Sequence, residues 1–281
     1  MKTAPAPLFR RKTDSYLLEL FLIVIALLFL YPIYIMIASS FYSEGASSAV
    51  LPIPNLTNWE KYGMILADAQ FYRSLFNSIV VTCSTIAIAV VVTSMAGYAI
   101  SRQGKGILNW ILLLFLSGLI IPLQTTMIPQ FKLALLLDLM NTKTFLVLLY
   151  TAGMIPFATF IYAGFTKTIS REIEESAMLD GCGKFRTFWS IVFPLLAPAT
   201  GTVIVTNMFG IWNDFINPLI YLQDTNKMTA ITYIYNFKQK YSTDWGAVFA
   251  VCTLISVPLL IVFGVVQKRL FQSVAAGALK G

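Results

Sequence analysis

The residues best suited to chemistry form a charged island in a largely apolar chain, with the sequence Glu174-Glu175-Ser176-Ala177-Met178-Leu179-Asp180-Gly181-Cys182. The two glutamates are adjacent in sequence, not placed to face each other across a cleft as an acid–base pair would be. The pair Gly183-Lys184 lacks the glycine at position 178 and the Ser or Thr at position 185 that a phosphate-binding loop requires. The chain has no histidine, which excludes a Ser-His-Asp triad. The sequence therefore predicts that this chain is not an enzyme.

Two short helices joined by a turn are expected to present the island. Ser170 is a suitable N-cap, and three acids follow in the first turns, where the helix dipole favours negative charge: Glu172, Glu174 and Glu175. Gly181 is expected to end this helix in a left-handed conformation. A second helix is predicted from about Lys184 until Pro194 breaks it. The result is a helix-turn-helix knob.

The composition indicates that the knob belongs to a membrane protein. Hydrophobic residues make up 57% of the chain and charged residues only 12%, about half the charged fraction of a soluble domain. The net charge of +7 does not indicate nucleic-acid binding, because the basic residues flank apolar runs. The three cysteines are far apart in sequence and predict neither a disulfide framework nor a zinc site.

Six apolar runs are each long enough to cross a hydrocarbon core of about 30 Å. The sequence thus predicts an all-α membrane protein with six transmembrane helices at 20–43, 74–101, 107–131, 144–166, 199–222 and 246–267. The first run is too long for a signal peptide and is expected to be retained. The predicted organisation is an N-terminal segment 1–16, a membrane domain 17–270 that contains the loop at about 167–197, and a C-terminal tail 271–281.

The basic residues predict the orientation. Thirteen of the 20 Lys and Arg residues lie on the side of the termini and the charged loop, and seven lie on the other side. By the positive-inside rule, both termini and the loop are expected in the cytoplasm.

The charged island at 174–182 resembles the EAA loop of the membrane subunits of ABC importers. The likeness to the carbohydrate (maltose-type) branch of this family continues along most of the chain. The family pattern has Glu-Ala-Ala, Asp-Gly-Ala and Ile-x-Leu-Pro, where this chain has Glu175-Ser176-Ala177, Asp180-Gly181-Cys182 and Ile191-Val192-Phe193-Pro194. Ser176, Cys182 and Phe193 depart from it modestly. The C-terminal residues Gly277, Lys280 and Gly281 are similar to the tail of one of the two membrane subunit types, which reaches the ATPases.

The resemblance implies a permease subunit that moves a sugar or oligosaccharide across the cytoplasmic membrane of a bacterium or archaeon by alternating access. Its implied partners are a second homologous permease subunit, two ATPase subunits and an extracytoplasmic solute-binding protein. ATP and Mg would be bound by the ATPases, and this chain would hold no cofactor. The island residues, Glu174 and Asp180 among them, would contact an ATPase, with Glu175 pairing with a basic residue and Gly181 allowing close docking. The alternatives are a self-contained channel or secondary transporter, and an importer of a non-sugar solute such as a glycerol phosphate.

Two further groups of residues are candidate sites. Polar residues inside predicted spans are candidates for lining a cavity, because burying them in lipid is costly: Asn77, Asn207, Asn213, Asp214 and Asn217. Capping or pairing at a helix terminus or at a subunit interface is the alternative for Asp214, and the one we prefer. The external loop 223–245 carries Tyr233, Tyr235 and Phe237, which suit either contact with a sugar or binding protein or an interfacial aromatic belt.

Overall fold

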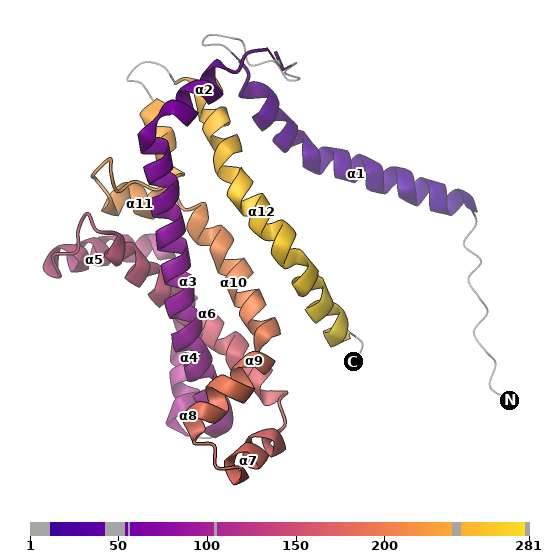
Figure 1. Ribbon diagram of the computed structural model, residues 1–281, viewed down its shortest axis with the longest axis vertical. Helices are drawn as coiled ribbons and strands as arrows, with labels where there is room; N and C mark the ends of the chain where they lie inside the picture. The colour runs from indigo at the N-terminus through magenta and orange to yellow at the C-terminus, as the bar shows by residue number, and fades with distance from the viewer. Residues whose placement is uncertain (1–11, 43–53, 56, 104–105, 238–242, 279–281) are drawn as a thin grey trace. The chain divides into compact units, whose positions relative to one another are not determined.

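The structure is a computed structural model that describes residues 12–42, 54–55, 57–103, 106–237 and 243–278, with only the backbone described at 12–15, 17, 123 and beyond residue 264. Within these ranges every regular element is a helix (Figure 1). In chain order they are α1 (Lys12–Ser39), α2 (Glu60–Ala67), α3 (Ala69–Gln103), α4 (Ile107–Gly118), α5 (Leu123–Leu136), α6 (Lys143–Lys167), α7 (Arg171–Leu179), α8 (Lys184–Thr187), the π-helix η1 (Phe188–Val192), α9 (Phe193–Leu195), α10 (Ala197–Trp212), α11 (Ile216–Tyr221), the 3₁₀-helix η2 (Thr232–Phe237) and α12 (Trp245–Ala278).

The chain divides into two compact units. One comprises Met1–Ala67 and Asn236–Leu254, and the other comprises Asp68–Tyr235 and Ile255–Gly281. In the first unit, an ion pair between Lys61 of α2 and Asp244 connects α2 to the beginning of α12. Asp244 also accepts a hydrogen bond from the backbone N–H of Ala247 at 3.0 Å and so caps α12. The second unit contains the charged island.

The apolar helices confirm most of the predicted spans but not all six. Among the described residues, four helices are long and apolar enough to cross a membrane, namely α1, α3, α6 and α12. A fifth span results if the bent pair Lys184–Leu195 and Ala197–Trp212, which meet at 71°, is counted as one. The run 199–222 is interrupted after Trp212, and its last part forms α11.

The predicted span 107–131 is not one helix. It is divided into α4, which has only 12 residues, and α5, and a 12-residue helix is about 18 Å long. Pro122 stands at the break with an extended backbone, φ −59° and ψ 130°. Proline has no N–H to donate and disfavours helical conformation at the residue before it. A helix that continued through this point would therefore lose a backbone hydrogen bond.

Close packing of α3 against α6 forms the centre of the second unit. The closest approach is at Gly97 of α3, where an added Cβ would lie 2.6 Å from the Cβ of Tyr162 and 2.8 Å from the backbone nitrogen of Ala163. The hydroxyl of Tyr162 continues the contact to α10, donating a hydrogen bond to Oγ1 of Thr200 at 3.0 Å. The residues buried along this packing include Val81, Ala89, Leu146, Met154 and Ala158.

We expect Gly97→Ala to destabilise the protein, because the added methyl group must displace backbone atoms of α6. Overpacking of this kind costs about 1–3 kcal/mol, more than the roughly 1 kcal/mol that alanine gains over glycine in a helix. The matched control is Gly153→Ala on α6, where an added Cβ meets nothing within 4 Å. Thermal unfolding of the detergent-purified protein should show a lower midpoint for Gly97→Ala alone, and equal midpoints for both variants would contradict the close packing.

Candidate functional site

The charged island forms the helix-turn-helix knob that the sequence predicts. Ser170 caps α7, its hydroxyl accepting a hydrogen bond from the N–H of Glu172 at 3.3 Å. Gly181 ends the helix with φ +84°, a left-handed conformation that glycine adopts without strain. The N–H of Cys182 then bonds the carbonyl of Ala177 at 2.9 Å, which closes the turn.

The second arm of the knob ends at Leu195, one residue past the predicted break at Pro194. Helical backbone continues from α8 through the π-helical η1 into α9. Pro194 does not end this arm, because it stands at the beginning of α9, where its missing N–H costs little. The change of direction comes after Leu195, between α9 and α10.

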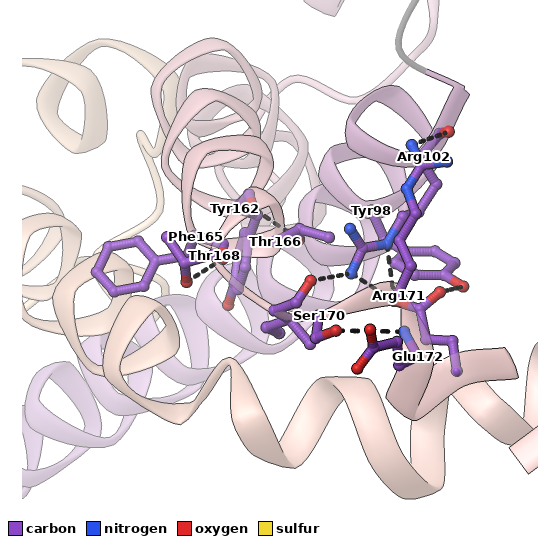
Figure 2. Close-up of polar contacts among 11 residues, drawn as sticks. Tyr98, Arg102, Tyr162, Phe165, Thr166, Thr168, Ser170, Arg171 and Glu172 are labelled. Atoms are coloured by element: carbon purple, nitrogen blue, oxygen red, sulfur yellow. Dashed lines mark hydrogen bonds and ion pairs between the residues drawn. The ribbon is translucent and has the colours of Figure 1, made fainter. Parts of the chain in front are cut away.

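Glu174 is buried, and its carboxylate is held by α3. Glu174 is only 5% exposed. Tyr98 donates a hydrogen bond to Oε2 at 2.8 Å, and Nε of Arg102 donates to Oε1 at 2.7 Å. Figure 2 shows Tyr98 and Arg102 of α3 beside Arg171 and Glu172 at the start of α7. Both oxygens of Glu174 are therefore engaged within the chain.

The other island residues present a mixed face to the surroundings. Glu175, Ser176, Asp180 and Gly181 are exposed, whereas Ala177 is buried and Cys182 is half-buried. Two apolar side chains stand beside these polar groups: Leu179 is 89% exposed and Phe185 is 68% exposed. An acid flanked by exposed apolar side chains is suited to docking on a protein with a basic residue beside an apolar recess.

Sequence reasoning missed four residues of this site, namely Tyr98, Arg102, Leu179 and Phe185. Leu179 and Phe185 had a signal, since they are large apolar residues within a charged loop. Tyr98 and Arg102 had none that spacing alone reveals, because more than seventy positions separate them from Glu174.

Asn77, one of the candidate cavity residues, is buried and makes hydrogen bonds within the chain. It is 4% exposed, and its amide nitrogen donates to the carbonyls of Asn226 at 2.9 Å and Met228 at 3.0 Å. Its oxygen accepts a hydrogen bond from Nζ of Lys143 at 2.9 Å. These bonds tie the loop that follows α11 to α3 and α6.

Asp214 caps α11, as the preferred sequence interpretation has it. Its Oδ1 accepts from the N–H of Ile216 at 3.0 Å, and its Oδ2 accepts from the hydroxyl of Tyr150 at 2.9 Å and from the amide of Asn217 at 2.6 Å. The carboxylate thus fixes the corner between α10 and α11 against α6. Asn207 and Asn213 donate to carbonyls one turn earlier in α10, at 2.8 Å and 3.0 Å.

The aromatic residues Tyr233, Tyr235 and Phe237 differ in exposure and do not form one exposed surface. Tyr233 is 1% exposed, and its hydroxyl donates to Oδ2 of Asp68 at 2.5 Å. Burial, and then the hydrogen bond to this carboxylate, raise the pKa of the Tyr233 phenol above its ordinary value. Tyr233 is therefore part of the core, while Tyr235 is exposed and Phe237 is half-buried. At the C-terminus, Gly277 lies in the backbone of α12, and Lys280 and Gly281 lie outside the described residues.

Comparisons with known proteins bear on this site. The family model for the inner membrane component of binding-protein-dependent transport systems matches residues 62–276. The chain is 33% identical to the probable ABC transporter permease protein YurM of Bacillus subtilis (strain 168), over 94% of this chain and 87% of that protein. It is 30% identical to the probable starch degradation products transport system permease protein AmyC of Thermoanaerobacterium thermosulfurigenes, over 95% and 97%. It is 27% identical to the melibiose/raffinose/stachyose import permease protein MelC of Bacillus subtilis (strain 168), over 96% and 99%.

A solved structure shows the same fold. The chain resembles a chain in the crystal structure of a bacterial ABC transporter involved in the import of the acidic polysaccharide alginate, with a TM-score of 0.81 and 21% identity. The match covers 94% of this chain and 99% of the other. The chain thus shares its overall helical fold with a chain of that transporter.

Substitutions at Asp214 separate capping from a role of its charge. We expect Asp214→Ala to lower stability by about 0.5–2 kcal/mol, because two N–H groups of α11 lose their acceptor. Asp214→Asn is the matched control, since asparagine caps about as well as aspartate but carries no charge. Thermal unfolding should place Asp214→Asn between Asp214→Ala and the wild type, because its Oδ1 keeps both caps but its NH2 cannot accept the bonds that Tyr150 and Asn217 donate. A stable Asp214→Asn variant that no longer transports would show instead that the negative charge itself is needed.

Proposed function

The chain belongs to the family of inner membrane components of binding-protein-dependent transport systems, and from this premise we propose that it is one of two permease subunits of an ATP-driven sugar importer. Two cytoplasmic ATPase subunits dock on the knob, and an extracytoplasmic binding protein delivers the sugar. ATP and Mg are bound by the ATPases. Counting the divided segment α4–α5 as one further passage beside the other five, the chain crosses the membrane six times and has both termini in the cytoplasm.

The observation that carries this proposal is that, of two adjacent glutamates, Glu174 is buried and paired while Glu175 is exposed. The first carboxylate is paired inside the chain with Tyr98 and Arg102. The second is exposed on the same helix, which Gly181 ends with a positive φ. A knob that is internally fixed and externally charged is what a rigid docking element requires, whereas a simple connector needs neither feature.

The proposed mechanism is alternating access. ATP binding closes the ATPase pair, which moves the two docked knobs, and the permease helices then open the central path outward to accept sugar. ATP hydrolysis returns the path to the inward-open state. A self-contained channel or secondary transporter would have no use for the exposed acid at Glu175, and this alternative is not favoured.

A carbohydrate substrate is supported by the relatives, whose names refer to starch degradation products and to melibiose, raffinose and stachyose. The test is stimulation of ATP hydrolysis in proteoliposomes by the cognate binding protein with maltodextrin, melibiose or raffinose. Stimulation by glycerol 3-phosphate instead of these sugars would reassign the substrate class.

Substitutions in the turn test ATPase docking. We expect Gly181→Val to block close approach and to strain the turn by roughly 1 kcal/mol or more, because its φ is positive. Glu175→Arg replaces attraction by repulsion at a partly desolvated contact, a loss of about 2–5 kcal/mol. Pull-down with the second permease subunit should retain that subunit but lose the ATPases.

The chain provides controls for both changes. Gly183 is exposed and has a negative φ of −69°, so Gly183→Ala should keep the ATPases. Glu172 is exposed at the start of the same helix as Glu175, so Glu172→Arg matches the change of charge. Wild-type retention of ATPases and sugar uptake in both turn variants would refute docking at the knob.

Cysteine labelling tests the proposed orientation. With Cys83, Cys182 and Cys252 replaced, Thr225→Cys should react with a membrane-impermeant maleimide in intact cells and Gln103→Cys should not. Both positions are exposed at opposite ends of the second unit's spans, so access to the maleimide depends on the side of the membrane. The reverse labelling pattern would invert the topology.

A further inference from the structure

The end of α3 next to the knob is held by both arms of the knob. Tyr98 and Arg102 are one helical turn apart on α3, and together they bind the two oxygens of Glu174 in α7. Arg102 also donates from Nη2 to the carbonyl of Ile169 at 3.0 Å, and Arg171 donates to the carbonyl of Arg102 at 3.1 Å. Side chains of α3 therefore donate hydrogen bonds to the first arm and its N-terminal neighbour Ile169, and the first arm donates one back to α3 (Figure 2).

The second arm meets the same tyrosine. The ring of Tyr98 packs on the ring of Phe188 in η1, with centroids 5.0 Å apart. Phe188 is buried and in turn packs on Trp189 at 5.0 Å. Tyr98 therefore contacts α7 through its hydroxyl group and η1 through its ring.

The opposite end of α3 holds the external loop. Asn77 donates to two carbonyls of that loop, those of Asn226 and Met228. The hydroxyl of Ser78 accepts from the N–H of Ala230 at 2.9 Å. Between Asn77 and Arg102 the helix is continuous and without proline, so it spans roughly 35–40 Å at a rise of about 1.5 Å per residue.

We propose that α3 is a rigid connecting rod between the ATPase-docking knob and the external loop 223–232, and that Arg102 is the positioning residue that makes the knob and α3 move as one body. This inference rests on the proposed function. Arg102 acts through Glu174 and touches neither the ATPase nor the sugar. Its role is to carry the state of the external loop to the ATPases, and the state of the ATPases back.

The arrangement favours coupling over simple stabilisation. A buried ion pair is weak evidence for stability, because apolar residues of similar size often serve as well. Here the ion pair and the tyrosine instead fix the orientation of the knob relative to α3. Besides Glu174, Arg102 binds the carbonyl of Ile169 just before α7, and Tyr98 packs on Phe188 in the second arm. A helix anchored at both ends cannot shift at one end without displacing the other.

The experiment compares basal with binding-protein-stimulated ATP hydrolysis of the whole complex in proteoliposomes. The sugar is whichever of maltodextrin, melibiose and raffinose stimulates the wild type most. The variants are Arg102→Gln, the neutral pair Arg102→Gln with Glu174→Gln, and Tyr98→Phe, which keeps the ring on Phe188 but loses the hydroxyl. Glu172→Gln, an exposed acid on the same helix, is the matched control.

We expect all three variants to retain the ATPases and basal hydrolysis, while the stimulation ratio falls at least about fivefold for Arg102→Gln, as coupling between sites typically amounts to about 5- to 150-fold. The swapped pair Arg102→Glu with Glu174→Arg should restore part of the ratio. Unchanged stimulation in all three variants would overturn the proposal. So would loss of the ATPases in all three, since the cluster would then serve only to fold the knob.

Failure of the proposed function would be seen separately. It would appear in the wild type, as a complex without ATPases or without stimulation by any of the three sugars. In that case α3 would have no ATPase to connect with the external loop, and the proposed role of Arg102 would be refuted together with the proposed function.

Discussion

The engagement of the Glu174 carboxylate by Tyr98 and Arg102 joins the first arm of the knob to α3. An ionised carboxylate that is nearly buried is stable only when both oxygens have partners, and here a hydroxyl and a guanidinium provide them. Once Glu174 faces α3, the helical period places Ala177 on the same inner face, and both residues are buried. Glu175 and Leu179 are then exposed as a consequence of that rotation.

The same constraint governs the polar residues of the apolar segments. Hydrocarbon offers no hydrogen bonds, so a polar group in a span must find its partner within the protein. Asn77 satisfies its amide with two carbonyls and a lysine, and Asp214 satisfies its carboxylate with two N–H groups, a tyrosine and an asparagine. Asp214 stands between α10 and α11, and Asn77 stands inside α3 and binds the loop that follows α11. Their polarity fixes corners of the fold, and neither needs a substrate to complete its hydrogen bonds.

The sequence predicted those features that depend on neighbouring residues. The cap at Ser170, the end of α7 at Gly181 and the long apolar helices follow from local rules and are confirmed. It did not predict which of two adjacent glutamates is buried, because that depends on Arg102 in a distant helix. It also did not predict the division of 107–131, since Pro129 and Pro156 are accommodated inside helices while Pro122 ends up at a break. The environment of a proline, more than its presence, decides the outcome. Tyr233 is buried for a similar reason, because its partner Asp68 comes from 165 positions earlier.

The close packing of α3 determines what kind of movement the knob can impose. At Gly97 the backbones of α3 and α6 approach so closely that not even a methyl group fits between them, and Tyr162 extends the contact to α10. Interiors packed at this density shift between discrete arrangements and do not deform continuously. A displacement of the knob would therefore carry α3, α6 and α10 together, and little of it would be lost in bending α3. In this arrangement Gly97 and Arg102, little more than one helical turn apart, have complementary roles: the glycine joins α3 to its neighbouring helix, and the arginine joins α3 to the knob.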